Sequence, residues 1–272
     1  MLGVPEAWMK LIVISRADPV SSRIGGILVE NYGFKEAGEG FYRRGEVFLK
    51  EIGEKHIYSN GLGEDLSPEL IVVASSHRSE AGMKALLTHP VGNWGEDASM
   101  GGPPRTLAPT SATALYNSLQ ALREEASSLR LDEWSVGLEV THHGPATRIP
   151  LIFVEAGGPP DEIPPARVLE AVASACLKAC EPRMKAPEPA IGFGGGHYAP
   201  TFTRLSLKAE YSFGHMCPKY HLPIDGEMIA QAFEKTLERP RIAVIDWKGV
   251  KGAARKALVE ALEDLGIGYV RA

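Results

Sequence analysis

The chain has 272 residues, of which 44% are hydrophobic and 23% charged, the composition of an ordinary globular protein. Its formal net charge of −5 excludes the broad basic surplus of a sequence-independent nucleic-acid binder, but leaves room for a local basic patch. No stretch approaches the roughly 20 apolar residues of a membrane span, and the N-terminus lacks a signal-peptide pattern. Three cysteines provide no disulfide framework, so we expect a reducing, cytoplasmic location.

Short apolar runs alternate with amphipathic segments along the chain. The predicted strands are KLIVIS (10–15), GEVFLKEI (45–52), ELIVVASSH (69–77), WSVGLEVTHHG (134–144), IPLIFVEAGG (149–158), AEYSFGHMCP (209–218) and RIAVIDW (241–247). The predicted helices cover 18–33, 112–130, 165–180, 226–238 and 252–266. This alternation predicts an α/β fold with a mixed, largely parallel sheet flanked by helices.

The segment 89–112 is long and rich in glycine and proline. A loop of this length within a compact domain is typically functional or mobile, and is not typical of a domain linker. The sequence shows no clear boundary elsewhere, so we expect residues 1–272 to form a single α/β domain.

Most of the eight histidines lie at or near the ends of predicted strands. Four of them follow a strand-like run directly: His77 after IVVASS, His89 after ALLT, and His142 and His143 after LEVT. His215 follows YSFG, and His197 follows a run of three glycines. In open α/β sheets ligands bind beyond the carboxyl ends of the strands, so we expect these imidazoles to converge.

Neutral imidazoles near a carboxylate are what a zinc site requires, and the available carboxylates are Glu139 and Glu155. No HExxH or CxxC signature is present, and the C-x3-H spacing of Cys217 and His221 is weak evidence. For any single histidine, the alternative is a strand-end cap or a core residue with one hydrogen bond. Spacing alone therefore leaves both readings open.

The stretch IGFGGGHYAPTFT contains Gly194, Gly195 and Gly196, which let a substrate approach the backbone. It is not a P-loop, because no lysine follows and the GxGxxG spacing is absent. The stretch DWKGVKGAARKAL gathers Lys248 and Lys251 near a helix start, where an anion is favoured, although a solvated basic face is equally compatible. In SSHRS, we expect Ser75 and Ser79 to position a ligand.

Several motifs together carry a resemblance to a known family. In order they are SSHRS, LTHPVGNWG, GLEVTHHGP, FVEAGG, GGGHYAPTFT, YSFGHMCPKYHLP and VIDWKG. With EVTHHGP and GGGHYAP as its specific parts, the chain resembles the archaeal and plant type of D-aminoacyl-tRNA deacylase from about residue 10 to about 250. One departure is Gly158, where the family pattern has serine, and it weakens any role for a hydroxyl there.

The resemblance implies hydrolysis of the ester between a D-amino acid and the 3′-terminal ribose of tRNA. It implies a zinc cofactor and a fold similar to peptidyl-tRNA hydrolase and purine nucleoside phosphorylase. The expected partners are tRNA and a D-amino acid, without a membrane, and the expected state is a monomer or small homo-oligomer. Carried over by motif, the candidate site consists of His77, His142, His143, Glu155, His197 and His215.

Within that set we expect specific roles. The expected metal ligands are His77, His142, His197 and His215, and the expected catalytic groups are Glu155, His143 and His197. The expected contacts to substrate or tRNA are Gly194, Gly195, Gly196, Lys248 and Lys251, with Arg43 and Arg44 as further tRNA contacts. Two alternatives remain: another zinc hydrolase, such as a peptidase or amidase on a similar scaffold, and a non-enzymatic tRNA-end binding protein.

Overall fold

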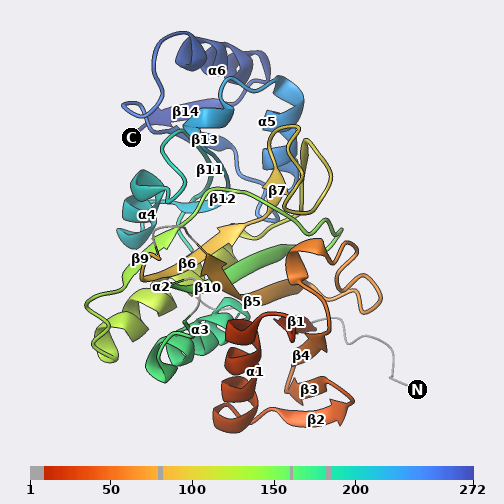
Figure 1. Ribbon diagram of the computed structural model, residues 1–272. Helices are drawn as coiled ribbons and strands as arrows, with labels where there is room; N and C mark the ends of the chain where they lie inside the picture. Colours follow the sequence, from red (N-terminus) through yellow and green to blue (C-terminus); the bar gives the residue numbers. More distant parts are fainter. Residues whose placement is uncertain (1–8, 79–81, 160–161, 182–185) are drawn as a thin grey trace.

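The computed structural model describes residues 9–78, 82–159, 162–181 and 186–272, so Ser79 lies outside it. Its main element is an eight-stranded sheet at the centre of Figure 1. In spatial order its strands are β2 (Lys35–Gly38), β3 (Phe41–Arg44), β4 (Val47–Ile52), β1 (Lys10–Ser15), β5 (Leu70–Arg78), β10 (Leu151–Gly158), β6 (Ala85–Pro90) and β9 (Ser135–Leu138). The central pairs β4–β1, β1–β5 and β5–β10 are parallel, and β10–β6 is antiparallel. The expected mixed, largely parallel sheet is confirmed.

A second sheet forms the upper part of the molecule in Figure 1. Its four parallel strands, in spatial order, are β12 (Ser212–Cys217), β11 (Pro189–Phe193), β13 (Ile242–Ile245) and β14 (Gly268–Arg271). The helices α4 (Pro200–Leu207), α5 (Gly226–Glu234) and α6 (Gly252–Asp264) accompany it, and the short turn η2 (Lys219–His221) follows β12. The short turn η1 (His56–Tyr58) follows β4 of the large sheet. Two short strands, β7 (Gly92–Asn93) and β8 (Thr106–Leu107), form a separate pair within segment 89–112.

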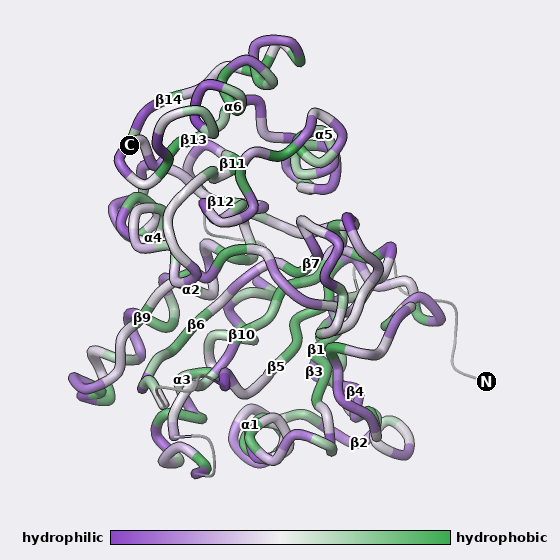
Figure 2. The backbone as a smooth tube through the Cα atoms, turned by 45° about the horizontal axis from the view of Figure 1, so that its top comes forward, coloured by the Kyte–Doolittle hydropathy of each residue, from purple (hydrophilic) through white to green (hydrophobic). Residues whose placement is uncertain are grey.

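Side-chain alternation gives the large sheet two different faces. On one face, Val72 and Ala74 of β5 and Val154 of β10 are buried against α1 (Pro19–Asn31), α2 (Ala112–Ser128) and α3 (Ala166–Ala179). On the other face, Val73 and Phe153 form a smaller core with loop residues. Figure 2 shows these central strands as mainly hydrophobic. Burial of both faces stabilises the sheet by about 25 cal/mol for each Å² of apolar surface removed from water.

The helix α2 packs against both sheets. Its Leu115 and Leu122 belong to the core beneath the large sheet. Its Leu119 belongs to a second core with Ala190 and Phe213 of the small sheet. This shared packing supports the proposal that the chain forms one domain. None of the helices in the described residues is long and apolar enough to cross a membrane.

The strand predicted over 134–144 ends at Leu138, so the prediction is wrong beyond that residue. The cause is tertiary, because the N–H groups of Val140 and Thr141 donate to the carbonyls of His197 and Met216, both at 2.9 Å. These carbonyls belong to the small sheet and its loop, so the chain leaves the large sheet here and bridges to the second one.

The helix predicted over 226–238 ends earlier, at Glu234, because the N–H of Leu237 donates to the carbonyl of Thr110 at 2.9 Å. Three further features were not predicted from the sequence: the edge hairpin β2–β3, the strand β11 and the helix α4. The last two flank the glycine run, and their short apolar pattern is weak.

Candidate active site

On one face of the large sheet, the side chains of β5 and β10 change from apolar to polar toward the carboxyl ends of these strands. Ser75 and His77 of β5 follow Val73 on the same side of the strand, because side chains alternate. Glu155 of β10 is the register partner of Ser75, and His89 of β6 is the partner of Phe153. Parallel pairing of β5 with β10 therefore places a hydroxyl, an imidazole and a carboxylate next to one another at the strand ends.

The segment after β9 adds three more groups, Glu139, His142 and His143. It is held by the bridge to the small sheet and by the N–H of Gly92, which donates to the carbonyl of His143 at 2.8 Å. His143 has a φ of +46°, a left-handed conformation that is unusual for a residue with a side chain. This bend turns two consecutive histidines toward one centre, with ring centroids 4.5 Å apart.

The glycine run positions His197. Gly194 has a φ of +108°, and a Cβ there would lie 2.5 Å from the side chain of Val250. Its N–H donates to the carbonyl of Cys217 at 2.8 Å, so this amide is engaged within the protein and does not face a substrate. Only glycine fits this close approach, which lets the chain turn and direct His197 toward the large sheet.

Three imidazoles share one tautomer because each bonds to a backbone carbonyl through Nδ1. The Nδ1–H groups of His142, His143 and His89 donate to Val140, Gly144 and Pro90 at 2.8, 2.6 and 3.0 Å. A carbonyl only accepts, so Nε2 of a neutral ring keeps its lone pair. Burial lowers the pKa of His142 well below its usual range and that of His143 to about 3, so both are neutral at pH 7.

Two buried carboxylates face these rings. Oε1 of Glu139 lies 2.8 Å from Nε2 of His197 and 3.4 Å from Nδ1 of His77. Yet neither oxygen of this fully buried carboxylate accepts an aligned hydrogen bond. The oxygens of Glu155 lie 3.5 Å from Nδ1 of His77 and 3.6 Å from Nε2 of His89.

The histidines around Glu155 determine its charge. Burial raises the pKa of Glu155, but the neighbouring His77 and His89 outweigh that and hold it well below its usual range. Burial lowers the pKa of His77, and the carboxylates of Glu155 and Glu139 outweigh it, so the net shift is upward. The site therefore contains an ionised carboxylate beside an imidazole that protonates readily.

The donor atoms suit a metal ion. Three overlapping groups have ligand atoms within 4.8 Å of one another: His77, Glu139 and Glu155; Glu139, His142 and His197; and His89, His142 and His143. A buried carboxylate without an aligned hydrogen bond is costly unless a cation neutralises it. Imidazole nitrogen and carboxylate oxygen are ligands that zinc accepts. The residues present thus fit a zinc ion.

Other predicted site residues lie apart from this centre. His215 on β12 is fully buried, with Nδ1 3.1 Å from Oγ1 of Thr141, and it belongs to none of the three groups. Burial lowers the pKa of His215 to about 3. Lys248 and Lys251 are exposed at the start of α6, whereas Arg43 lies on β3 near the outer edge of the large sheet.

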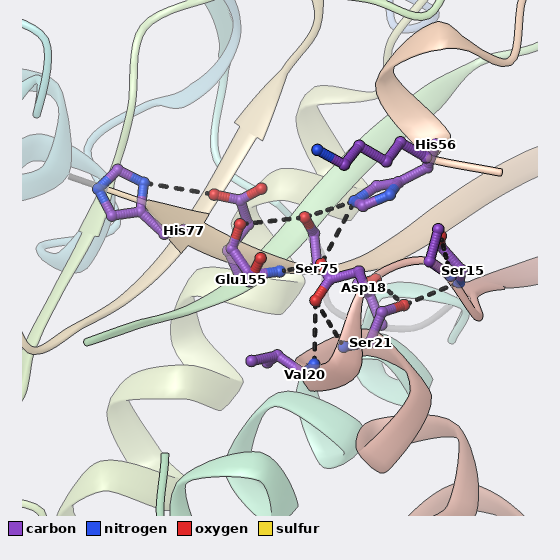
Figure 3. A network of polar contacts seen from close by, with 12 residues as sticks. Ser15, Asp18, Val20, Ser21, His56, Ser75, His77 and Glu155 are labelled. Carbon is purple, nitrogen blue, oxygen red and sulfur yellow. Dashed lines mark hydrogen bonds and ion pairs between the residues drawn. The ribbon is translucent and has the colours of Figure 1, made fainter. Parts of the chain in front are cut away.

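A cavity of about 410 Å³ opens beside the centre and is lined by His77, His142, Glu155 and His197 among others. A second polar group lines it: Nε2 of His56 lies 2.5 Å from Oγ of Ser75 and 4.0 Å from the carboxylate of Asp18. Figure 3 shows Ser75 between His56 and Glu155, with His77 beyond Glu155.

Glu139 was expected from sequence only as one of two carboxylates available to a zinc site, and no role was assigned to His89 or His56. The signal for Glu139 was its place three residues before His142, but the side on which it lies depends on the bend after β9. His89 was noted only as a strand-end residue. His56 follows no predicted strand, and nothing in its local sequence pointed to the site.

Comparison with known proteins decides the family. The sequence profile of D-aminoacyl-tRNA deacylases matches residues 64–270. The chain belongs to this family. The D-aminoacyl-tRNA deacylase of Thermococcus kodakarensis is 35% identical over 276 residues, which cover 97% of this chain and 100% of the relative. That of Methanosarcina acetivorans is 37% identical over 258 residues, covering 90% and 82%.

The fold has a solved counterpart as well. A crystal structure of a conserved protein of unknown function superposes with a TM-score of 0.89 at 32% identity, covering 98% of this chain and 96% of that one. The resemblance carried by the sequence motifs is therefore confirmed, and D-aminoacyl-tRNA deacylase is the enzyme family to which the chain belongs.

Proposed function

We propose that this chain hydrolyses the ester bond of D-aminoacyl-tRNA, releasing a free D-amino acid and tRNA, with the assistance of a zinc ion. The family supports the substrate. The observation that carries the chemistry is the buried carboxylate of Glu139, which faces Nε2 of His197 without an aligned hydrogen bond. A buried carboxylate that faces imidazole nitrogens and has no aligned hydrogen bond is typical of a cation site.

In this proposal Glu139, His142 and His197 hold the ion. Two imidazoles and one carboxylate are a common ligand set of catalytic zinc, which keeps a further position open. The bond from Nδ1 of His142 to Val140 leaves Nε2 available for the ion. When bound, zinc lowers the pKa of a water and polarises a carbonyl. His77 is an alternative ligand, because it forms another candidate group with Glu139 and Glu155.

Glu155 is the proposed general base. Its pKa is held below the usual range, so it is ionised at neutral pH and can accept a proton from the attacking water. The bond from water oxygen to the ester carbon forms, the bond to the ribose 3′ oxygen breaks, and that oxygen takes up the proton that Glu155 accepted from the water. His143, neutral because burial lowers its pKa to about 3, orients its neighbours and does not carry charge.

The residues expected from sequence to contact the substrate have different roles in this proposal. Gly194 shapes the turn before His197 and uses its N–H internally, so we assign it a structural role. A Cβ on Gly196 would meet nothing within 4 Å, so there is open space beside this residue for a ligand. Lys248 and Lys251 are exposed and are proposed to bind tRNA phosphates. The proposed location of the protein is the cytoplasm.

The deciding experiment follows release of amino acid from matched D- and L-aminoacyl-tRNA. We expect turnover of the D form, loss of activity after chelation, and recovery when zinc is returned. Full activity of demonstrably metal-free protein would exclude the zinc-assisted form of the proposal. Glu155→Gln should retain its metal but lose about 10²- to 10⁴-fold in kcat. Its control is Glu133→Gln, a carboxylate on the surface paired with Lys84.

A further inference from the structure

Exposed apolar side chains gather at the mouth of the cavity. The large hydrophobic residues that are exposed in the described part of the chain are Tyr58, Met100, Ile163, Tyr220, Leu237 and Leu265. Three of these, Tyr58, Met100 and Tyr220, are 49%, 53% and 58% exposed and belong to segments that line the cavity or adjoin its lining. We call these three residues, two tyrosines and a methionine, the aromatic rim. A concentration of exposed apolar surface beside a site is typical of a ligand contact.

Tyr220 is held in place relative to the candidate centre. It lies in η2, whose first residue, Lys219, donates its N–H to the carbonyl of Gly195 at 3.0 Å. Its hydroxyl lies 3.4 Å from Nδ1 of His197, while its ring is more than half exposed. The next residue, His221, lines the cavity, with its ring centroid 5.1 Å from that of Tyr220. A fixed aromatic ring therefore stands at the entrance.

Tyr58 and Met100 form another part of the same rim. Tyr58 ends η1, directly after the lining residues His56 and Ile57. A Cβ on Gly101 would lie 3.3 Å from Cδ1 of Tyr58, so the loop carrying Met100 is packed against this ring. The side-chain amide of Asn93 donates to the carbonyl of Gly101 at 2.9 Å and fixes that loop.

Exposed cations lie near the rim, beside carboxylates of the cavity lining. Lys55 precedes η1 and lines the cavity with Arg78, and Lys219 begins η2. All three are exposed, and Asp97 is an exposed carboxylate of the same lining. An aromatic surface bordered by cations suits a nucleotide, because the base stacks on the rings and the phosphates meet the cations.

We propose that the aromatic rim binds the unpaired terminal nucleobase of the tRNA by stacking, so that the 3′ ribose ester enters the cavity. This inference rests on the proposed function and assigns the base-binding subsite of the same pocket. An exposed base offers a flat apolar face, and the ring of Tyr220 offers another, within reach of His197. The rim thereby selects an ester that carries a nucleoside.

The test uses an unacylated RNA oligonucleotide that ends in CCA, labelled at its 5′ end, and measures its affinity for the full chain by fluorescence anisotropy. Tyr220→Ala and Tyr58→Ala should each weaken binding roughly 5- to 150-fold. Tyr220→Phe keeps the ring and should restore the affinity. Leu237→Ala, 58% exposed outside the cavity lining, is the matched surface control and should leave the affinity unchanged.

A second oligonucleotide, with an abasic terminal nucleotide, isolates the base. The wild-type protein should bind it more weakly than the intact oligonucleotide, and Tyr220→Ala should weaken its binding no further. Equal effects of Tyr220→Ala on both oligonucleotides, or no effect on either, would overturn the proposal, as would failure of the wild type to bind RNA. Because these probes carry no ester, their result is independent of hydrolysis, and a failure of the proposed deacylation would be seen separately.

Discussion

Nε2 of His197 lies 2.8 Å from Oε1 of Glu139, although the two residues follow strands of different sheets. Glu139 comes directly after β9 of the large sheet, and His197 comes after β11 of the small sheet. The backbone bond from Val140 to His197 joins the same two segments at 2.9 Å. The candidate centre is therefore complete only when the two sheets are packed together.

Replacing Glu139 by glutamine should remove the metal. We expect Glu139→Gln to lose most bound zinc and at least about 100-fold in kcat/KM, because the carboxylate is shared by two of the candidate ligand groups. Zinc should raise the thermal midpoint of the wild type, since a ligand that binds only the folded state stabilises it, and should not raise that of the variant. Elemental analysis and thermal scans check both. Glu133→Gln is again the control, and undiminished zinc in Glu139→Gln would contradict the assignment.

His215 should act on stability and not on metal content. His215→Leu removes the partner of the Thr141 hydroxyl, which also accepts the N–H of Met216 at 2.9 Å. We expect the free energy of unfolding to fall by about 1–3 kcal/mol while zinc stoichiometry stays the same. Urea unfolding of the zinc-free proteins and elemental analysis measure the two effects. Loss of zinc at unchanged stability would instead return His215 to the ligand set expected from sequence.

The glycine run should tolerate substitution at one end only. Gly194→Ala forces a side chain into a backbone with φ of +108° and against Val250. We expect a loss of about 1–3 kcal/mol of stability, together with reduced activity through misplacement of His197. Gly196→Ala has open space and no positive φ, so its free energy of unfolding should change by well under 1 kcal/mol. Equal stabilities of the two variants would show that the turn is not strained in this way.

The pair of Asp225 and Arg105 should make stability depend on acid pH. A hydrogen bond from Arg105 and the N–H of Met228 lower the pKa of Asp225. Because the folded pKa lies below the unfolded value of about 3.9, the carboxylate stabilises the fold above that pH. This contribution is lost as the pH falls through the folded pKa.

Asp225→Asn keeps a good helix cap and removes only the charge. The variant should be less stable than wild type at pH 7, by at most about 1 kcal/mol because the pair is exposed, and the difference should shrink as the pH falls through the folded pKa of Asp225. Urea unfolding at pH 7 and at a series of acid pH values measures it, and 1 M salt should shrink the difference at pH 7. A difference that persists unchanged at low pH would point to lost packing and not to charge.

Much of the fold followed from local pattern. The apolar runs at 10–15, 69–77 and 149–158 became β1, β5 and β10, and Asp18 caps α1 as expected, accepting the N–H of Val20 at 2.9 Å. The failures occurred where tertiary contacts override local preference. After Leu138 the chain turns to bond with the small sheet, and β11 is too short for its pattern to stand out.

The sequence by itself determined the family, through motifs such as EVTHHGP and GGGHYAP, and the kinds of side chain available to the site, strand-end histidines and glutamates. Only the tertiary structure decided which of them meet. It joined Glu139 to His197, set the tautomer of His142 and placed His215 away from the candidate centre. These outcomes depend on bonds between segments far apart in the chain, and local periodicity contains no information about such bonds.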